Sequence, residues 1–544
     1  MTHTPWWKQA VFYQIYPLSF QDTSGNGKGD LQGIIDRLDY LAELGVDALW
    51  ISPCFPSPMA DWGYDVSDYS DIHPELGSLE TLDRLLHSAH QRGLRVLLDF
   101  VPNHTSDQHP WFQESRRDRH NPKRDWYVWR DPGPQGGLPN NWLGYFSSPA
   151  WTWDAATQQY YLHSFLKEQP DLNWRNPQVR QAMRAVLRFW LERGVDGFRV
   201  DSVLPLVKDA QFRDNPLRTG PLIGKDMGPA GMQERRHSAN QPEVHEILRE
   251  WRALLDSFPG ERMMAGEVYT MDLAMGAAYH GRDDELHLVL TMGLLNLPWQ
   301  ARQIRAYVDA SEASLPAGAV ATLVLGSHDE PRLATSLGGD QARVAAMLLM
   351  TLRGAPFIYY GDEIGMLDGP ISPDLQRDSW PKISGLAQHS RDPARTPMQW
   401  DATPGAGFTS SSVSSGSTEP WLPVHPDYRE RNVETQLAEP RSILALYRRL
   451  LRLRRSSPVL LEGSYRPAPE VPDDCYVYYR SDAHQDLLVA LNFGGEDRVL
   501  SLADGRSGRI LVSTWLDREG QVGLGACSLR AHEGIIVQLQ PEAG

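Results

Sequence analysis

The chain has 544 residues, of which 41% are hydrophobic and 22% are charged, and this composition supports a globular core rather than a disordered chain. Its 53 Lys and Arg against 69 Asp and Glu leave a net charge of −16, which argues against nucleic acids and anionic membranes as partners. There is no apolar run near the ~20 residues of a membrane span and no signal-peptide pattern at the N-terminus. The 3 cysteines are too few for a disulfide framework or a zinc cage, so we expect a cytoplasmic protein.

Eight short β-rich runs precede residue 365, and most are continuous apolar runs, as in strands that are covered on both faces. They lie at residues 11–17, 46–52, 95–101, 195–202, 262–268, 286–292, 320–326 and 355–360. Helical periodicity lies between them, at residues 31–44, 78–92, 179–193, 242–257 and 341–353. This alternation predicts the α/β class and a (β/α)₈ TIM barrel.

The spacing of these runs predicts three domains. About 90 residues separate the third and fourth strands, and so long a connection indicates a small domain of its own. After residue 464 only short alternating runs remain, at 475–479, 487–492, 510–513 and 534–539, which predict an antiparallel β-sandwich. We therefore expect the barrel at 1–103 and 174–463, an inserted domain at 104–173 and a C-terminal β-domain at 464–544. The low-complexity run at 409–418 is predicted to be a mobile surface loop.

Polar side chains follow four of the predicted strands at their carboxyl ends, where a TIM barrel carries its active site. They are Asn103, His104, Arg199, Asp201, Glu267, His328 and Asp329. Each one alone could be a helix cap or a surface ion pair. Four such groups at the correct ends of correctly spaced strands instead indicate a catalytic site.

Two of these carboxylates suggest a pairing of an ionised and a protonated acid. Arg199 and Asp201 are two apart on a strand and face the same side, so the guanidinium should favour the ionised carboxylate that a nucleophile needs. Glu267 follows an apolar run, which should favour its protonated form. Glycoside cleavage uses such a pair. The alternatives are a plain ion pair in the barrel wall and a lone Glu at a strand end.

The sequence resembles the α-amylase family of glycoside hydrolases, family 13, over essentially its whole length. Four segments match the conserved regions of that family in order: DFVPNH at 99–104, GFRVD at 197–201, GE at 266–267 and SHD at 327–329. QPDLN at 169–173 matches the fifth region of its α-glucosidase and oligo-1,6-glucosidase branch. The segments at 6–17 and 394–400 are also typical of that branch.

The resemblance implies roles for individual residues. Asp201 would be the nucleophile, Glu267 the general acid/base, and Asp329 the third carboxylate, which holds the sugar's 2- and 3-hydroxyls. Asp61 and Arg395 would clamp the non-reducing terminal glucose and close the site beyond it. The substrate-binding residues implied are Asp61, Tyr64, His104, Phe146, Phe165, Arg199, His328 and Arg395.

These roles predict a retaining, exo-acting α-glucosidase that releases glucose from the non-reducing end of short oligosaccharides. Ser202, after the nucleophile, is neither the Val that accompanies α-1,6 activity in the branch nor the Thr that accompanies α-1,4 activity. We expect an α-1,4 preference with tolerance of α-1,6 or other bonds. A transglucosylase or sugar isomerase with the same chemistry stays open, as does a monomer or a homo-oligomer. A non-catalytic scaffold is disfavoured because the three carboxylates are kept.

The loop at 22–30 carries oxygen ligands at every second position with glycines between them, a pattern suited to a hard cation. The predicted ligands are Asp22, Ser24, Asn26, Lys28 and Asp30, and the resemblance implies that Lys28 acts through its carbonyl. The ion would be a structural Ca²⁺ or Mg²⁺, since the chemistry itself needs no cofactor. The alternative is a solvated Gly-rich turn. The segment at 212–241 follows the fourth strand and is expected to set the acceptor side of the site.

Overall fold

The computed structural model describes residues 4–219, 229–410, 419–502 and 506–540. Its centre is an eight-stranded parallel sheet in the order β10-β11-β1-β2-β3-β7-β8-β9. Thr322 Oγ1 of β10 donates to Val289 O of β9 at 2.6 Å, and this contact nearly closes the barrel. The strands are β1 Phe12–Ile15, β2 Ala48–Ile51, β3 Arg95–Phe100, β7 Gly197–Val200, β8 Met263–Glu267, β9 Leu288–Leu290, β10 Thr322–Val324 and β11 Ala355–Tyr359. All eight predicted strands of the TIM barrel are therefore confirmed.

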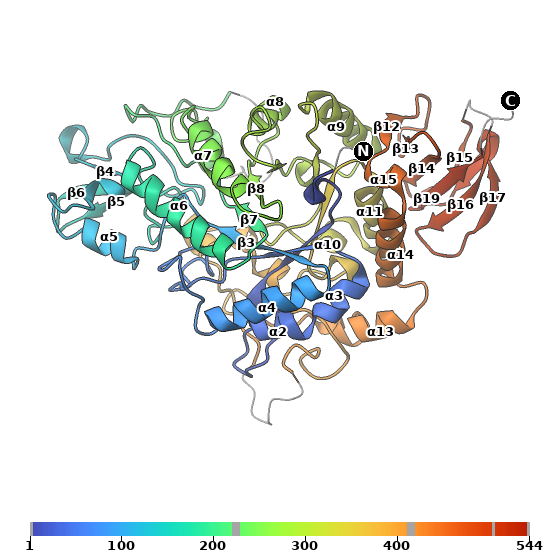
Figure 1. The fold of residues 1–544 in the computed structure, drawn as a ribbon, viewed down its shortest axis with the longest axis horizontal. Coiled ribbons are helices and arrows are strands. Elements are labelled where there is room, and N and C mark those ends of the chain that lie inside the picture. The colour runs from blue at the N-terminus through green and yellow to red at the C-terminus, as the bar shows by residue number, and fades with distance from the viewer. Residues whose placement is uncertain (1–3, 220–228, 411–418, 503–505, 541–544) are drawn as a thin grey trace.

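Helices surround this sheet (Figure 1), and apolar stripes on their inner faces hold them against the strands. They are α1 Pro17–Phe20, α2 Leu31–Asp36, α3 Leu38–Leu44, α4 Leu79–Gln91, α6 Pro177–Glu192, α7 Val244–Asp256, α8 Leu273–Ala278, α9 Ala301–Ser314, α10 Leu333–Leu337 and α11 Gly339–Thr351. Four further helices follow β11: α12 Trp380–Ser384, α13 Val433–Ala438, α14 Ile443–Ser456 and α15 Pro458–Leu461.

The single helix predicted at 31–44 is wrong in one respect, because the structure divides it into α2 and α3 at Arg37. Arg37 Nε donates to Gln21 Oε1 at 2.7 Å, and its guanidinium lies 4.0 Å from the Trp400 ring centre. These contacts come from distant parts of the chain, so helical periodicity alone could not reveal the break. The predicted C-terminal limit of this region at residue 44 is confirmed, since α3 ends at Leu44 and Gly45 follows it with a φ of 101°.

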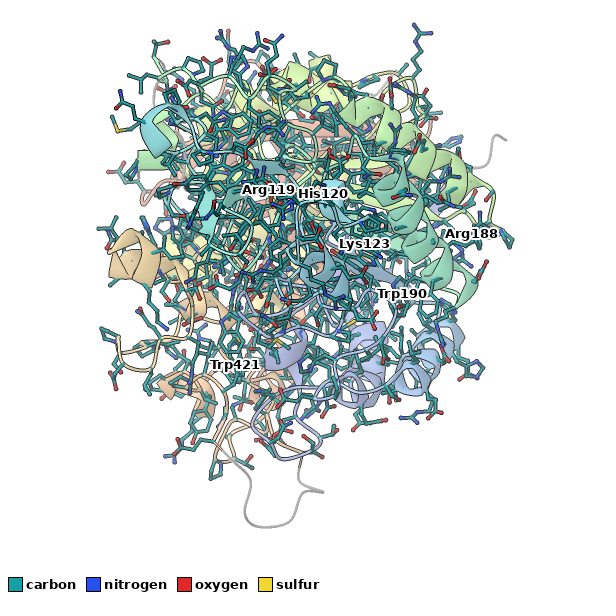
Figure 2. The ribbon with its side chains drawn as sticks, turned by 90° about the vertical axis from the view of Figure 1, so that its left-hand side faces the viewer. Arg119, His120, Lys123, Arg188, Trp190 and Trp421 are labelled. Carbon is teal, nitrogen blue, oxygen red and sulfur yellow. The ribbon has the colours of Figure 1, made fainter. Side chains whose placement is uncertain are left out.

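The segment between β3 and α6 forms a small three-stranded antiparallel sheet in the order β4-β6-β5, preceded by α5 Pro110–Ser115. Its strands are β4 Trp129–Arg130, β5 Trp151–Asp154 and β6 Gln159–Leu162. This part projects to one side of the barrel in Figure 1. Figure 2 views the molecule from that side and labels Arg119, His120 and Lys123 near its centre. The exact domain boundaries stay predictions.

The C-terminal part is an antiparallel β-structure on the opposite side of the barrel (Figure 1). One sheet has the order β12-β13-β14-β19-β16-β17, and β15 pairs with β18 in a second. The strands are β12 Ser464–Pro467, β13 Cys475–Ser481, β14 Asp486–Asn492, β15 Arg498–Leu500, β16 Ser507–Ser513, β17 Gly520–Gly523, β18 Cys527–Leu529 and β19 Gly534–Leu539. The predicted sandwich class is confirmed. The sequence missed β12, β15, β17 and β18, which are short and mostly at sheet edges.

Two sequence predictions fall partly outside the described residues. They concern the run at 409–418, of which 411–418 are not described, and the segment at 212–241, of which 220–228 are not described. Within the described ranges, the helices include none whose length and apolar character would let it cross a bilayer.

Candidate active site

Arg199 is the centre of a group of three carboxylates at the carboxyl ends of β3, β7 and β8. Its Nη1 lies 2.9 Å from Asp99 Oδ1 and 2.8 Å from Asp201 Oδ1, and its Nη2 lies 2.8 Å from Glu267 Oε2. The strands bring these residues together because β3 pairs with β7 and β7 with β8 in parallel register, with Asp99 opposite Arg199. One planar guanidinium therefore orients three acids at once.

The charge balance of this group favours partial protonation. Burial raises the pKa of Asp201; the contact with Arg199 lowers it but does not outweigh burial and the neighbouring acids Glu267 and Asp99. Burial also raises the pKa of Asp99 to about 6. The expectation that Arg199 alone keeps Asp201 ionised was therefore incomplete, because one cation faces three acids. A site of this kind can hold a shared proton, which is what an acid/base pair requires.

Asp329 and His328 follow β10 and lie beside this group. His328 is 2% exposed. Its Nε2 is 2.8 Å from the Tyr64 hydroxyl, and its ring stacks on the Tyr64 ring with an interplanar angle of 4°. The Tyr64 hydroxyl also donates to Asp99 Oδ2 at 3.1 Å. Burial lowers the pKa of His328 well below its ordinary value, so the ring is a neutral hydrogen-bonding group at neutral pH.

The residue paired with Asp61 is Arg391 rather than Arg395. Arg391 Nη2 lies 2.7 Å from Asp61 Oδ1, and the same guanidinium binds Asp378 through Nε and Nη2 at 2.9 and 2.8 Å. Its Nη1 lies 3.3 Å from Asp329 Oδ1. Arg395 instead lies 2.8 Å from Asp329 Oδ1 and donates from Nε to the His328 carbonyl at 2.8 Å. The two arginines therefore share Asp329, but only Arg391 joins it to Asp61.

Aromatic and polar side chains from the inserted segment complete the site. Phe146 is buried, and the Arg391 guanidinium lies 5.3 Å from its ring centre. Phe165 lies with its ring centre 5.2 Å from that of His104. Gln169 Nε2 donates to Asp61 Oδ2 at 3.1 Å and is 3.0 Å from His104 Nε2, so it links these two residues. Burial lowers the pKa of His104 to about 4.

The structure thus brings together all eleven residues that the sequence suggested as catalytic or substrate-binding, and it adds four that sequence reasoning missed. The added residues are Asp99, Gln169, Asp378 and Arg391. Asp99 and Gln169 lie inside the motifs that carried the resemblance. Arg391 lies four residues before Arg395, and nothing in the sequence decided which of the two meets Asp61.

In the loop at 22–30, the carboxylates of Asp22 and Asp30 accept hydrogen bonds from backbone N–H groups. Asp22 Oδ1 accepts hydrogen bonds from the Ser24 and Gly25 N–H groups at 3.0 and 2.7 Å, and Oδ2 accepts one from Gly27 N at 3.1 Å. Asp30 instead caps α2 by accepting from Gly33 N at 2.7 Å. In the described ranges, no three His, Cys, Asp or Glu side chains are grouped to hold a metal. The ion stays a prediction, which thermal melting with EDTA and with added Ca²⁺ would test.

The chain is similar to known proteins over nearly its whole length. Residues 14–463 match the family model of the alpha amylase catalytic domain. A probable alpha-glucosidase of Rhizobium meliloti (strain 1021) is 41% identical, with 94% of this chain and 95% of that protein covered. An oligo-1,6-glucosidase of Parageobacillus thermoglucosidasius is 38% identical, with 92% of each covered.

Two solved structures have the same fold throughout. The alpha-glucosyl transfer enzyme XgtA has a TM-score of 0.92 and 40% identity, covering 99% of this chain and 100% of that one. The trehalulose synthase MutB from Pseudomonas mesoacidophila MX-45 has a TM-score of 0.89 and 35% identity, with 99% and 100% covered.

Proposed function

Because the chain belongs to the α-amylase family of glycoside hydrolases, we propose that it is a retaining, exo-acting α-glucosidase that releases glucose from the non-reducing end of short α-glucosides. The observation that carries this proposal is the simultaneous contact of Arg199 with Asp201 and Glu267, 2.8 Å in each case. It sets a nucleophile and an acid on neighbouring strands, as double displacement needs.

In the first step Asp201 attacks the anomeric carbon as Glu267 gives its proton to the glycosidic oxygen, so the leaving sugar departs as an alcohol. In the second step the Glu267 carboxylate takes a proton from a water that attacks the same carbon and frees Asp201. The two inversions retain the α-configuration. Neither step needs a cofactor, because the carboxyl groups supply the nucleophile and the proton.

Exo-action is supported by the ion-pair network at Asp61. Asp61, Asp329 and Asp378 are held by Arg391, and Gln169 binds Asp61 from the inserted segment. We assign this network to the non-reducing end of the terminal glucose, where charged groups can hold its outer hydroxyls and block longer chains. Arg395 then supports Asp329 rather than closing the site with Asp61.

A second candidate is a transglucosylase or sugar isomerase, in which a sugar replaces water in the second step. It is favoured by the similarity to XgtA, whose structure is titled an alpha-glucosyl transfer enzyme, and to MutB, a trehalulose synthase whose substrate is sucrose. The two candidates share the first step. They differ in the acceptor. We expect the linkage preference to depend on Ser202, which follows the proposed nucleophile.

Product analysis distinguishes these candidates. We would incubate the purified protein with maltose, isomaltose, trehalose, sucrose and soluble starch, with Asp201→Asn as the control. Free glucose from disaccharides, little from starch and no turnover by the variant would establish the α-glucosidase and rank its linkages. Longer or rearranged sugars would instead favour the transferase. A wild type without turnover on any of them would refute both.

A further inference from the structure

Lys208 is a buried cation in the loop after β7, outside the group of catalytic carboxylates. Its side chain is 3% exposed, and its Nζ lies 2.7 Å from Asp171 Oδ2. The same Nζ donates to Asn103 Oδ1 at 2.8 Å. Asn103 Nδ2 donates to Asp171 Oδ1 at 2.9 Å, so the three side chains close a ring of contacts.

This ring joins the barrel to the inserted segment. Asn103 follows β3 and Lys208 follows β7, whereas Asp171 lies at the end of the inserted segment, before α6. The backbone reinforces the junction, since Leu172 N donates to Asn103 O at 3.0 Å. Asp171 is fully buried, and among the described residues Lys208 is the cation that lies within 4 Å of it. A buried carboxylate needs such a partner.

Each acceptor in the ring adjoins a residue assigned to the glucosyl site. Asn103 Nδ2 is 3.1 Å from His104 Nδ1. Ser164, the residue before Phe165, donates its N–H to Asp171 Oδ1 at 2.9 Å. Gln169, two residues before Asp171, contacts both Asp61 and His104. The ring therefore fixes the backbone from which the sugar-facing groups extend.

We propose that Lys208 is a positioning residue, which neutralises Asp171 and thereby holds His104, Gln169 and Phe165 in place across the junction of the barrel and the inserted segment. It touches no reacting atom. The inference rests on the proposed function, because that function gives His104, Gln169 and Phe165 their contact with the glucosyl unit. Loss of Lys208 should therefore weaken catalysis in protein that is still folded.

The first test is Lys208→Met, which keeps the length of the side chain and removes its charge. We expect kcat/KM for maltose to fall about 100-fold, with a raised KM, since small displacements of positioning groups cost about that much. Inhibition by glucose should weaken with it. Rates would be measured well below the melting temperature, with circular dichroism as the check on folding. The matched control is Lys167→Met, a lysine of the inserted segment whose side chain is 68% exposed.

Two further variants separate positioning from folding. Lys208→Arg retains a cation and donors for Asp171 and should restore most of the lost kcat/KM. The double variant Lys208→Met with Asp171→Asn removes the unpaired charge, so it should fold even where the single variant does not, and it should still lose activity because the ring is broken. A lowered melting temperature with unchanged kcat/KM, in folded Lys208→Met or in the folded double variant, would overturn the proposal. A wild type without turnover would instead refute the proposed function and this inference with it.

Discussion

Arg391 Nη2 lies 2.7 Å from Asp61 Oδ1, although the two residues are 330 positions apart in the chain. Both side chains are buried, at 7% and 6% exposure, and Phe146 lies against the guanidinium. Burial raises the pKa of Asp61, while Arg391 opposes this effect by stabilising the charged form. The Asp61–Arg391 pair is therefore shielded from water. Its fixed geometry restricts which ligands can bind beside it.

The fork geometry of Arg391 should be essential for this site. A lysine cannot bind Asp61, Asp329 and Asp378 at once, because its ammonium is a single point charge. We expect Arg391→Lys to lower kcat/KM for maltose by about 100-fold. Arg391→Ala should in addition lower the free energy of unfolding by roughly 3–5 kcal/mol, since it leaves buried acids unpaired. Kinetics and urea unfolding would measure both, with the exposed Arg429→Ala as the control. Wild-type kcat/KM in Arg391→Lys would contradict the assignment.

Glu267→Gln should reveal the acid role of this residue through the leaving group. The amide keeps an oxygen for the hydrogen bond from Ser202 N, which is 3.1 Å long in the wild-type structure, but it cannot donate a proton to the glycosidic oxygen. We expect kcat/KM to fall about 100-fold more for maltose than for an aryl α-glucoside, whose leaving group departs without protonation. Asp201→Asn should be inactive on both substrates. Equal losses on the two substrates in Glu267→Gln would exclude its acid role.

Ser202 lies beside the acid, and its substitution should change the linkage preference. It adopts a φ of +43° and donates its N–H to Glu267, so its backbone is held beside the proposed acid. We expect Ser202→Val to raise the ratio of kcat/KM for isomaltose over maltose by about 10-fold, and Ser202→Thr to lower it. The ratio is the informative quantity, because a β-branched residue at positive φ is strained and lowers both rates. An unchanged ratio in both variants would remove Ser202 from the linkage determinants.

His109 should make the protein less stable in acid. Its Nδ1 accepts the Trp111 N–H at the start of α5, and burial lowers its pKa to about 4. Because the unfolded chain binds this proton near pH 6.5 and the folded chain does not, the contribution is complete above that pH and is lost as the pH falls towards 4. Asn is a good N-cap without titration. His109→Asn should therefore show a shallower loss of unfolding free energy between pH 6.5 and 4, measured with urea. Parallel curves would contradict this.

The eight barrel strands were predictable because each is an apolar run long enough to be buried on both faces, and the carboxyl ends of four runs pointed to the site. The contacts between residues within the site were harder to predict from the sequence. Arg391 and Arg395 lie four residues apart, and only the position of Asp61, in the distant loop after β2, selects between them. Lys208 carried no signal at all, since a lone lysine in a loop is normally exposed. Long-range contacts of this kind decide the site, and local patterns do not encode them.

One guanidinium facing three carboxylates has a consequence for inhibition and for the choice of assay. When these acids ionise, the region around Arg199 holds surplus negative charge, which matches the positive charge that develops at the anomeric carbon during reaction. A small protonated amine that carries several hydroxyls imitates that state and should compete with substrate. Rates measured in an amine buffer will therefore lie below those in phosphate at the same pH, and basic sugar analogues are a natural starting point for inhibitors.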